Sequence, residues 1–105
     1  MNTEKSLGIF NESIKYIPGG VNSPVRSFKS VGGNPLIIEK GRGSYIWDAD
    51  GNEYIDYLLG SGPMITGHAH PDVMEAVKNQ LENGTTFFAN NEPAILLAEE
   101  ISNAM

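Results

Sequence analysis

The sequence predicts an α+β fold: an amino-terminal helix, a three-stranded antiparallel meander and then two further helices. Apolar residues recur at helical spacing before residue 18 and again after residue 70. Between these stretches, short runs of β-branched and aromatic residues alternate with turn sequences over roughly residues 36–57. Most of the 12 glycines lie between Gly19 and Gly67, which leaves few side chains there to fill a core.

The first helix is expected at about residues 4–16. Its apolar positions are Leu7, Phe10, Ile14 and Ile17, and its candidate caps are Asn2, Thr3 and Ser6. The run Pro18-Gly19-Gly20 should end this helix, because proline cannot continue the hydrogen-bond ladder and glycine readily adopts left-handed backbone.

The meander is predicted from the runs "PLIIEK", "SYIWD" and "NEYIDY". Asp50-Gly51 is a strong hairpin turn signal between the second and third of these runs. Tyr45 and Trp47 share one strand face. We expect Tyr54 on the corresponding face of the next strand, in an aromatic ladder that packs against protein.

Four acidic residues surround this hairpin: Asp48, Asp50, Glu53 and Asp56. Paired carboxylates or a calcium site are one interpretation. However, Asp50 is needed for the turn, the later glutamate of an EF-hand is missing, and neighbouring strand residues point to opposite faces. We therefore expect a solvated acidic hairpin.

Residues 58–70 contain three glycines and a proline without periodicity, and a loop is expected there. Pro71 suits the first position of a second helix, and Gly84 supplies its stop. A third helix should begin near residues 91–93. The apolar stripes of these helices are Val73, Ala76, Val77 and Leu81, and then Ala94, Leu97, Ala98, Ile101 and Met105.

The chain is interpreted as two parts. Residues 1–57 form the helix and the small meander, and residues 58–105 form a loop and the start of a major domain. The last apolar stripe reaches Met105 without a glycine stop or a polar tail. We therefore expect these 105 residues to be the amino-terminal segment of a longer polypeptide.

Composition argues against several classes of function. Seven Lys and Arg residues against 13 Asp and Glu give a net charge of -6, which disfavours a nucleic-acid partner because phosphate contacts need clustered cations. Without cysteine there is no disulfide framework, thiolate nucleophile or cysteine-based zinc site. No apolar run reaches membrane-spanning length, and "MNTEKSLGIF" has no signal-peptide core, so we expect no membrane partner and a cytoplasmic location.

Two motifs are weak candidates for binding sites, one for a phosphate and one for a metal ion. The run "GSGPMITG" could cradle a phosphate, but it matches neither the dinucleotide fingerprint nor the P-loop, and a plain structural loop is favoured. His68 and His70, with Asp72, could ligate a metal. Because His70-Pro71 is typical of a helix entry, a capping histidine beside an apolar-packed one is favoured, and no metal site is predicted.

The stretch "IPGGVNSPVRSF" carries Arg26, one of two arginines in the chain, between rigid turn residues. A guanidinium matches a carboxylate in a bidentate geometry that lysine cannot reproduce, and the flanking turns would restrict where it points. An ordinary surface arginine in a linker is an equally good interpretation from the residues alone.

The order of these pieces carries a resemblance to a known family. The segments "YIPGGVNSPVRSFKSVGGNPLIIEKGRGSYIWDADGNEYIDY", "GP" and "GHAHPDVMEAV" closely resemble the amino-terminal region of the glutamate-1-semialdehyde 2,1-aminomutases. These belong to the class III aminotransferases, which have the type I pyridoxal-phosphate fold. "PGGVNSPVR" is rather specific to the aminomutases, whereas "DxDGxxYID" and "GHxHP" occur across class III.

The resemblance implies a substrate-binding role for three residues. By position, Arg26 would receive the substrate carboxylate, with Ser23 beside it. Ser61 stands where the aminomutases usually have the tryptophan of "GSWGP", which removes a large wall from the expected substrate site. The run "TTFFANNEPAILLAEE" also departs from the aminomutase pattern and is closer to related class III aminotransferases.

The implied parent enzyme uses pyridoxal 5'-phosphate to convert glutamate 1-semialdehyde to 5-aminolevulinate, in tetrapyrrole biosynthesis. A class III aminotransferase acting on another amino acid is the alternative, and a non-catalytic module that binds carboxylates is a third. In all relatives the cofactor's lysine and phosphate donors come later in the chain, so no catalytic or cofactor-binding residue is assigned here. Relatives are homodimers, and exposed apolar stripes also favour a homo-oligomer.

We predict that this chain alone binds no pyridoxal phosphate stably and performs no transamination, because the chemistry needs a Schiff-base lysine and phosphate donors. The measurement is an absorption spectrum after adding the cofactor. A band from lysine-bound cofactor that borohydride reduces would contradict the prediction.

Overall fold

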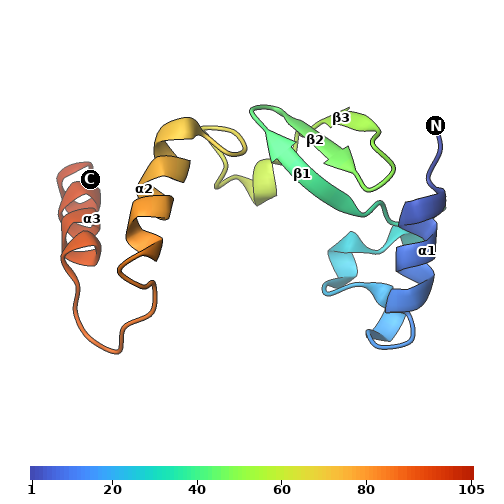
Figure 1. Ribbon diagram of the computed structural model, residues 1–105, viewed down its shortest axis with the longest axis horizontal. Coiled ribbons are helices and arrows are strands. Elements are labelled where there is room, and N and C mark those ends of the chain that lie inside the picture. The colour runs from blue at the N-terminus through green and yellow to red at the C-terminus, as the bar shows by residue number, and fades with distance from the viewer. The chain divides into compact units, whose positions relative to one another are not determined.

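The computed structural model describes residues 1–105, and their contacts divide the chain into two compact units, Met1–His70 and Pro71–Met105. The first unit contains helix α1 (Glu4–Ser13) and strands β1 (Ile38–Arg42), β2 (Tyr45–Asp48) and β3 (Glu53–Ile55). The second contains helices α2 (Pro71–Leu81) and α3 (Glu92–Asn103) (Figure 1). This order of elements confirms the predicted α+β architecture.

Helix α1 is shorter than the predicted span of residues 4–16. After Ser13 the chain continues as single turns, and the Ser13 hydroxyl lies 2.7 Å from the carbonyl oxygen of Phe10 and 2.9 Å from that of Gly20. The 3₁₀ turn Pro18–Gly20 therefore folds back onto the helix. Gly20 is required there, because a Cβ at its φ of +73° would lie 2.6 Å from the Phe10 ring.

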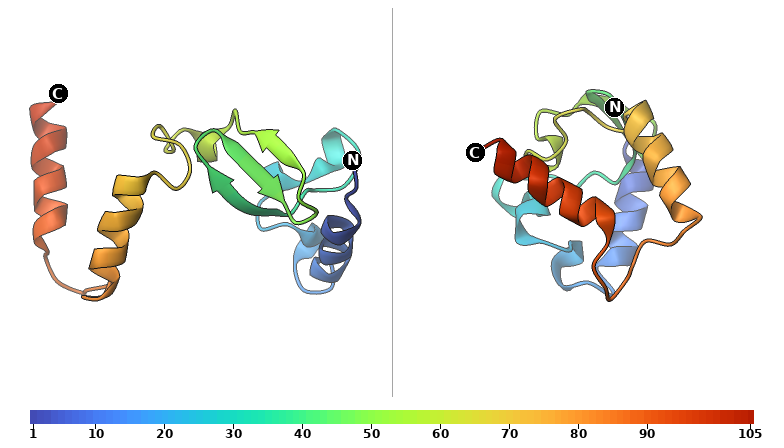
Figure 2. Two further views of the ribbon diagram at one scale, coloured as in Figure 1. Left: turned by 45° about the horizontal axis from the view of Figure 1, so that its top comes forward. Right: turned by 90° about the vertical axis from the view of Figure 1, so that its left-hand side faces the viewer.

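The cap of α1 comes from a distant residue. Both carboxylate oxygens of Asp50, in the β2–β3 turn, accept hydrogen bonds, one from the Lys5 amide and one from the Ser6 amide, each at 2.8 Å. Among the predicted caps, Asn2 accepts from the Glu4 amide at 3.0 Å, whereas Thr3 makes no capping bond. Figures 1 and 2 show α1 beside the end of the sheet that carries this turn.

The three strands form an antiparallel sheet in the order β1-β2-β3, as predicted, although the paired residues lie within 38–55 rather than 36–57. The expected position of Tyr54 is wrong. Tyr54 pairs with Ile46, and Trp47 pairs with Glu53. Because cross-strand partners share a face, Tyr54 lies on the opposite face from Trp47.

The face that carries Trp47 instead holds a cation. The Tyr45 and Trp47 ring centroids are 6.2 Å apart, and the Lys40 ammonium lies 4.7 Å from the Trp47 ring centroid. Lys40 and Trp47 are cross-strand partners, so β1 and β2 place this cation–π contact directly.

The expectation of a solvated acidic hairpin is wrong for Asp48, which is only 1% exposed. One oxygen of its carboxylate accepts from the Asp50 amide at 3.0 Å and the Asn52 amide at 2.8 Å. The other accepts from the Asn52 side chain at 2.8 Å and the Tyr54 hydroxyl at 2.7 Å. Burial by itself raises the pKa of Asp48, but these hydrogen bonds outweigh it and lower the pKa.

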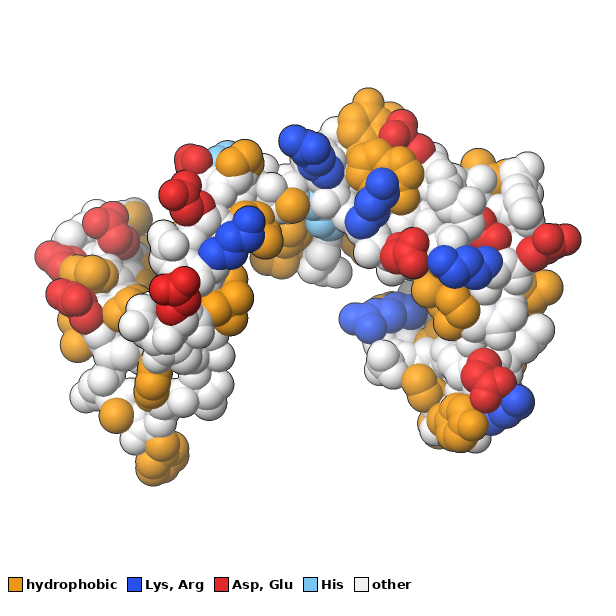
Figure 3. Space-filling view, viewed as in Figure 1, with side chains coloured by type: hydrophobic (Ala, Val, Ile, Leu, Met, Phe, Trp, Pro, Cys, Tyr) orange, Lys and Arg blue, Asp and Glu red, His pale blue; other side chains and the backbone are white.

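The second unit begins its helices where the sequence predicts. Pro71 is the first residue of α2, and Asn91 caps α3 by accepting a hydrogen bond from the Ala94 amide at 3.1 Å. The apolar residues of both helices are exposed, and Figure 3 shows hydrophobic side chains at the surface of both units. None of the helices combines the length and hydropathy that a membrane crossing requires.

Asp48 should make the stability of the first unit depend on acidic pH. Because its folded pKa lies below the ordinary value of 3.8, its stabilisation is complete above that value and is lost as the pH falls through the folded pKa. We predict that Asp48→Asn loses less stability than the wild type between pH 7 and about pH 3. Urea unfolding followed by Trp47 fluorescence measures this difference.

The matched control for this experiment is Glu53→Gln, at an exposed position of β3. It should keep the wild-type dependence on pH. Equal losses of stability in the wild type and Asp48→Asn would contradict the prediction.

Candidate functional site

The first unit contains a groove of about 560 Å³ between α1, the 3₁₀ turns that follow it and the entry to β1. The residues that line it are Phe10, Ser13, Ile17, Gly20, Val21, Asn22, Val25, Arg26, Phe28, Pro35, Leu36, Ile37, Ile38 and Leu58. Arg26 is the one charged residue among them, so the groove offers an apolar surface with a single cation.

Local turns hold the backbone on both sides of Arg26. Pro24 begins a 3₁₀ turn (Pro24–Arg26), in which the Arg26 amide donates to the Ser23 carbonyl at 3.0 Å. The next 3₁₀ turn (Phe28–Ser30) starts at Ser27, whose hydroxyl accepts from the Lys29 amide at 3.3 Å. Hydrogen-bonded turns therefore precede and follow the arginine, at the positions where the sequence predicts turn residues.

The guanidinium of Arg26 forms no salt bridge within the chain. The ion pairs join Lys5 to Glu39, Lys15 to Glu12 and His68 to Asp56. Arg26 is therefore available for an external anion. Because a guanidinium presents parallel N–H donors, a carboxylate whose apolar portion lies along the groove fits this arrangement best.

No acid–base or nucleophilic pair lines the groove. It contains no histidine, aspartate, glutamate or lysine, and its hydroxyl is that of Ser13, which already hydrogen-bonds to backbone carbonyls. The groove can bind and orient a molecule but lacks the groups for proton transfer. It also offers no lysine for a Schiff base, so a pyridoxal cofactor does not fit these residues alone.

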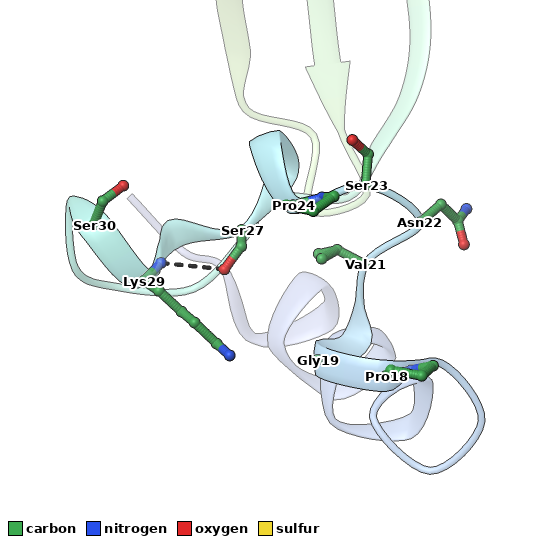
Figure 4. Close-up of a pocket in the computed structure, with 9 residues that line it drawn as sticks. All are labelled: Pro18, Gly19, Val21, Asn22, Ser23, Pro24, Ser27, Lys29 and Ser30. Atoms are coloured by element: carbon green, nitrogen blue, oxygen red, sulfur yellow. Dashed lines mark hydrogen bonds between the residues drawn. The ribbon is translucent and has the colours of Figure 1, made fainter.

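Ser23 lies beside this groove and lines a second, smaller pocket. This pocket, of about 340 Å³, is formed by Pro18, Gly19, Val21, Asn22, Ser23, Pro24, Ser27, Lys29 and Ser30. In Figure 4 the Ser23 hydroxyl points away from Val21 and Ser27, and the Lys29 side chain extends away from the turn that carries it. Val21 and Asn22 line both hollows, so Ser23 and Arg26 lie on adjoining surfaces.

Ser61 lies in a turn with unusual backbone geometry. Four consecutive residues have positive φ: Leu59 at 48°, Gly60 at 65°, Ser61 at 71° and Gly62 at 108°. A non-glycine residue in this region costs about 1–2 kcal/mol. The turn begins at Leu58, which lines the groove with Arg26, whereas Ser61 itself is not among the lining residues.

The strained turn is held by a carboxylate that the sequence prediction assigned to solvent. One oxygen of Asp56 accepts from the Leu58 amide at 2.9 Å and the Leu59 amide at 3.1 Å. The other lies 2.7 Å from Nε2 of His68. The His68 hydrogen bond is the main reason that the pKa of Asp56 is lowered, and the Leu59 amide adds to it.

The expectation that one histidine is packed among apolar residues is wrong for His68, because its Nε2 atom lies 2.7 Å from the Asp56 carboxylate. No group of three His, Cys, Asp or Glu side chains could hold a metal ion in this chain. The other histidine does not cap through its buried Nδ1 atom, because the Nδ1 of His70 has no hydrogen-bond partner. Asp56 and His68 are twelve positions apart in the sequence, and no local sequence pattern indicates that they form a pair.

Comparison with known proteins identifies a family match. The family model described as "Aminotransferase class-III" matches residues 28–105, which includes the meander, the strained turn and both later helices.

Curated relatives match most or nearly all of this chain. A glutamate-1-semialdehyde 2,1-aminomutase from Thermodesulfovibrio yellowstonii is 54% identical over 104 residues, which is 99% of this chain and 24% of that protein. A glutamate-1-semialdehyde 2,1-aminomutase 2 from Brevibacillus brevis is 61% identical over 92 residues, 88% of this chain and 21% of that protein. The chain thus spans about a quarter of the length of the relatives it matches.

Solved structures show the same fold. A transaminase with PLP bound superposes with a TM-score of 0.86 and 35% identity, over 98% of this chain and 24% of its own. A glutamate-1-semialdehyde-aminomutase from Pseudomonas aeruginosa PAO1 superposes with a TM-score of 0.80 and 25% identity, over 94% of this chain and 22% of its own.

The positive φ of Ser61 gives a direct test of the strained turn. We predict that Ser61→Gly raises the free energy of unfolding by about 0.5–1 kcal/mol relative to Ser61→Ala, because alanine keeps the left-handed strain and glycine removes it. The gain is partly offset by the larger entropy of glycine in the unfolded chain. Urea unfolding of the two variants measures it, and a less stable glycine variant would contradict the assigned geometry.

Proposed function

This chain belongs to the class III aminotransferase family, and we propose that it supplies the amino-terminal quarter of a glutamate-1-semialdehyde 2,1-aminomutase. Its fold is that of the corresponding part of type I pyridoxal-phosphate enzymes. The observation that carries the proposal is that Arg26 lines an apolar groove and forms no salt bridge. The relatives of this chain are glutamate-1-semialdehyde 2,1-aminomutases.

In the proposed enzyme, this chain binds and orients the substrate. Glutamate 1-semialdehyde has a carboxylate at one end and a short aliphatic stem, and the product is 5-aminolevulinate. The Arg26 guanidinium would hold the carboxylate through two parallel hydrogen bonds, and the aliphatic stem would lie along the apolar residues of the groove, such as Phe28. Pyridoxal phosphate, when bound, would supply the amino-group transfer and act as electron sink.

We also propose that the cofactor's lysine and phosphate donors come from polypeptide outside these 105 residues. Lys5 and Lys15 are paired with carboxylates, and Lys40 lies over Trp47. Lys29 lines the smaller pocket, and Lys78 lies in α2, in the other unit. None of the five lysines lines the groove with Arg26.

The proposed enzyme acts in the cytoplasm, in tetrapyrrole biosynthesis, as a homo-oligomer. The exposed apolar residues of α2 and α3 support association, because isolated soluble chains rarely leave such surfaces uncovered.

A second candidate is a class III aminotransferase that acts on another amino acid carrying a carboxylate. Two observations favour it. Ser61 replaces the large aromatic residue of the aminomutase pattern. The chain is also more similar in sequence to the solved transaminase with PLP bound, at 35% identity, than to the solved Pseudomonas aminomutase, at 25%.

The test uses the complete polypeptide that contains this chain, loaded with pyridoxal phosphate. We predict that Arg26→Gln raises KM for glutamate 1-semialdehyde by about 10- to 100-fold, because a charge-assisted hydrogen-bonded pair is lost. Steady-state kinetics of 5-aminolevulinate formation measure the change. Arg42→Gln, at an exposed position of β1, removes the same charge from the only other arginine and should leave KM unchanged.

Two results would contradict this proposal in different ways. A wild-type enzyme that transaminates another amino acid but does not turn over the semialdehyde would favour the second candidate. An Arg26→Gln variant with the same KM as Arg42→Gln would show that Arg26 does not bind the substrate.

A further inference from the structure

The structure assigns Asp56 and His68 a positioning role: we propose that this pair holds the turn at residues 58–62 against the substrate groove. The effect on substrate affinity rests on the function proposed above, whereas the effect on the turn does not. Neither residue lines the groove, so neither is expected to touch the substrate.

The turn needs an external restraint because its backbone is unfavourable. Leu59 and Ser61 both have positive φ, at 48° and 71°, although neither is glycine. Side chains rarely adopt this conformation unless the surrounding structure imposes it. Inside the turn, the Ser61 amide donates to the Leu58 carbonyl at 2.9 Å and the Met64 amide donates to the Leu59 carbonyl at 3.2 Å. These bonds close the turn but do not place it on the sheet.

Asp56 provides that placement because its two oxygens face in different directions. One receives the Leu58 and Leu59 amides, at the start of the turn. The other receives Nε2 of His68. The Asp56 amide donates to the Ser44 carbonyl at 2.8 Å, which fixes the residue to the β1–β2 hairpin. The sheet therefore fixes the backbone of Asp56, and its carboxylate binds the amides at the start of the turn.

His68 is itself fixed to the same hairpin. Its amide and carbonyl exchange two hydrogen bonds with Gly43, each at 2.8 Å. Its ring lies directly over Gly41, where an added Cβ would be 2.6 Å from the ring. The glycine therefore leaves the space that lets the imidazole reach Asp56.

The pair connects to the groove through Leu58. The Leu58 amide is bound to Asp56, and Leu58 lines the groove together with Val25 and Arg26. If the carboxylate loses its orientation, the turn relaxes toward ordinary backbone angles and this part of the groove moves. Substrate binding should then weaken, while groups that react with the substrate stay in place.

The experiment uses the complete polypeptide loaded with cofactor and three forms of residue 68. His68→Leu removes the hydrogen-bond donor but keeps an apolar side chain over Gly41. His68→Gln places an amide N–H near the position of Nε2 and is the matched rescue variant. Hydrogen exchange of the peptide that contains Leu58 and Leu59 reports on the turn, and steady-state kinetics with glutamate 1-semialdehyde report on the site.

We expect His68→Leu to speed exchange at Leu58 and Leu59 about tenfold and to raise KM about tenfold, with kcat within twofold of the wild type. His68→Gln should restore both quantities to within about threefold. Rescue by the donor distinguishes positioning from mere packing, because leucine and glutamine both fill the space.

Unchanged exchange at Leu58 and Leu59 in His68→Leu would overturn the proposal. So would equal defects in His68→Leu and His68→Gln, or a fall in kcat without a rise in KM. A wild-type enzyme that does not turn over the semialdehyde would refute the proposed function alone, because the exchange comparison still decides whether the pair holds the turn.

Discussion

The first unit depends on the carboxylate of Asp50, which joins the start of α1 to the β2–β3 turn. The helix begins with free amide groups, and the two that Asp50 receives come from residues 44 and 45 positions earlier in the chain. Asp48 orients this interaction, because its buried carboxylate accepts the Asp50 amide. Burial raises the pKa of Asp50, but the Ser6 and Lys5 amides outweigh that effect and keep the pKa below its usual value. Because α1 and the entry to β1 both line the groove, we expect the position of α1 that these carboxylates hold to affect the shape of the groove.

The residues that line the groove are suited to binding a molecule and not to reacting with it. The groove pairs one unneutralised guanidinium with an apolar surface and has no residue that can move a proton. The turns around Arg26 limit its positions, and the strained turn after Asp56 contributes Leu58 to the same groove. The chain spans about a quarter of its aminomutase relatives, and this composition of the groove fits our proposal that it contributes a contact to the substrate while the reactive groups come from other polypeptide.

The sequence predicted features that depend on neighbouring residues and missed those that depend on distant ones. Pro71 and Asn91 mark helix starts through local backbone chemistry, and Asp50-Gly51 marks the hairpin, so all three were predictable. The face of Tyr54 was not, because it follows from a register in which even-numbered residues of β2 and β3 lie opposite each other. Similarly, no local pattern reveals that Asp50 caps a helix 45 positions away or that Asp56 meets His68. The turns around Arg26 were predictable because they are local, whereas its proposed role came from the family resemblance and its groove from the way distant segments pack.

Hydrogen exchange of Asp50→Ala, compared residue by residue with the wild type, tests most directly whether this carboxylate shapes the groove. Our account predicts that the Lys5 and Ser6 amides lose protection and that the Gly20 and Arg26 amides lose it with them, because the α1 wall is no longer held. If only the Lys5 and Ser6 amides change, while Gly20 and Arg26 exchange as in the wild type, the groove is formed independently of Asp50 and the account is wrong.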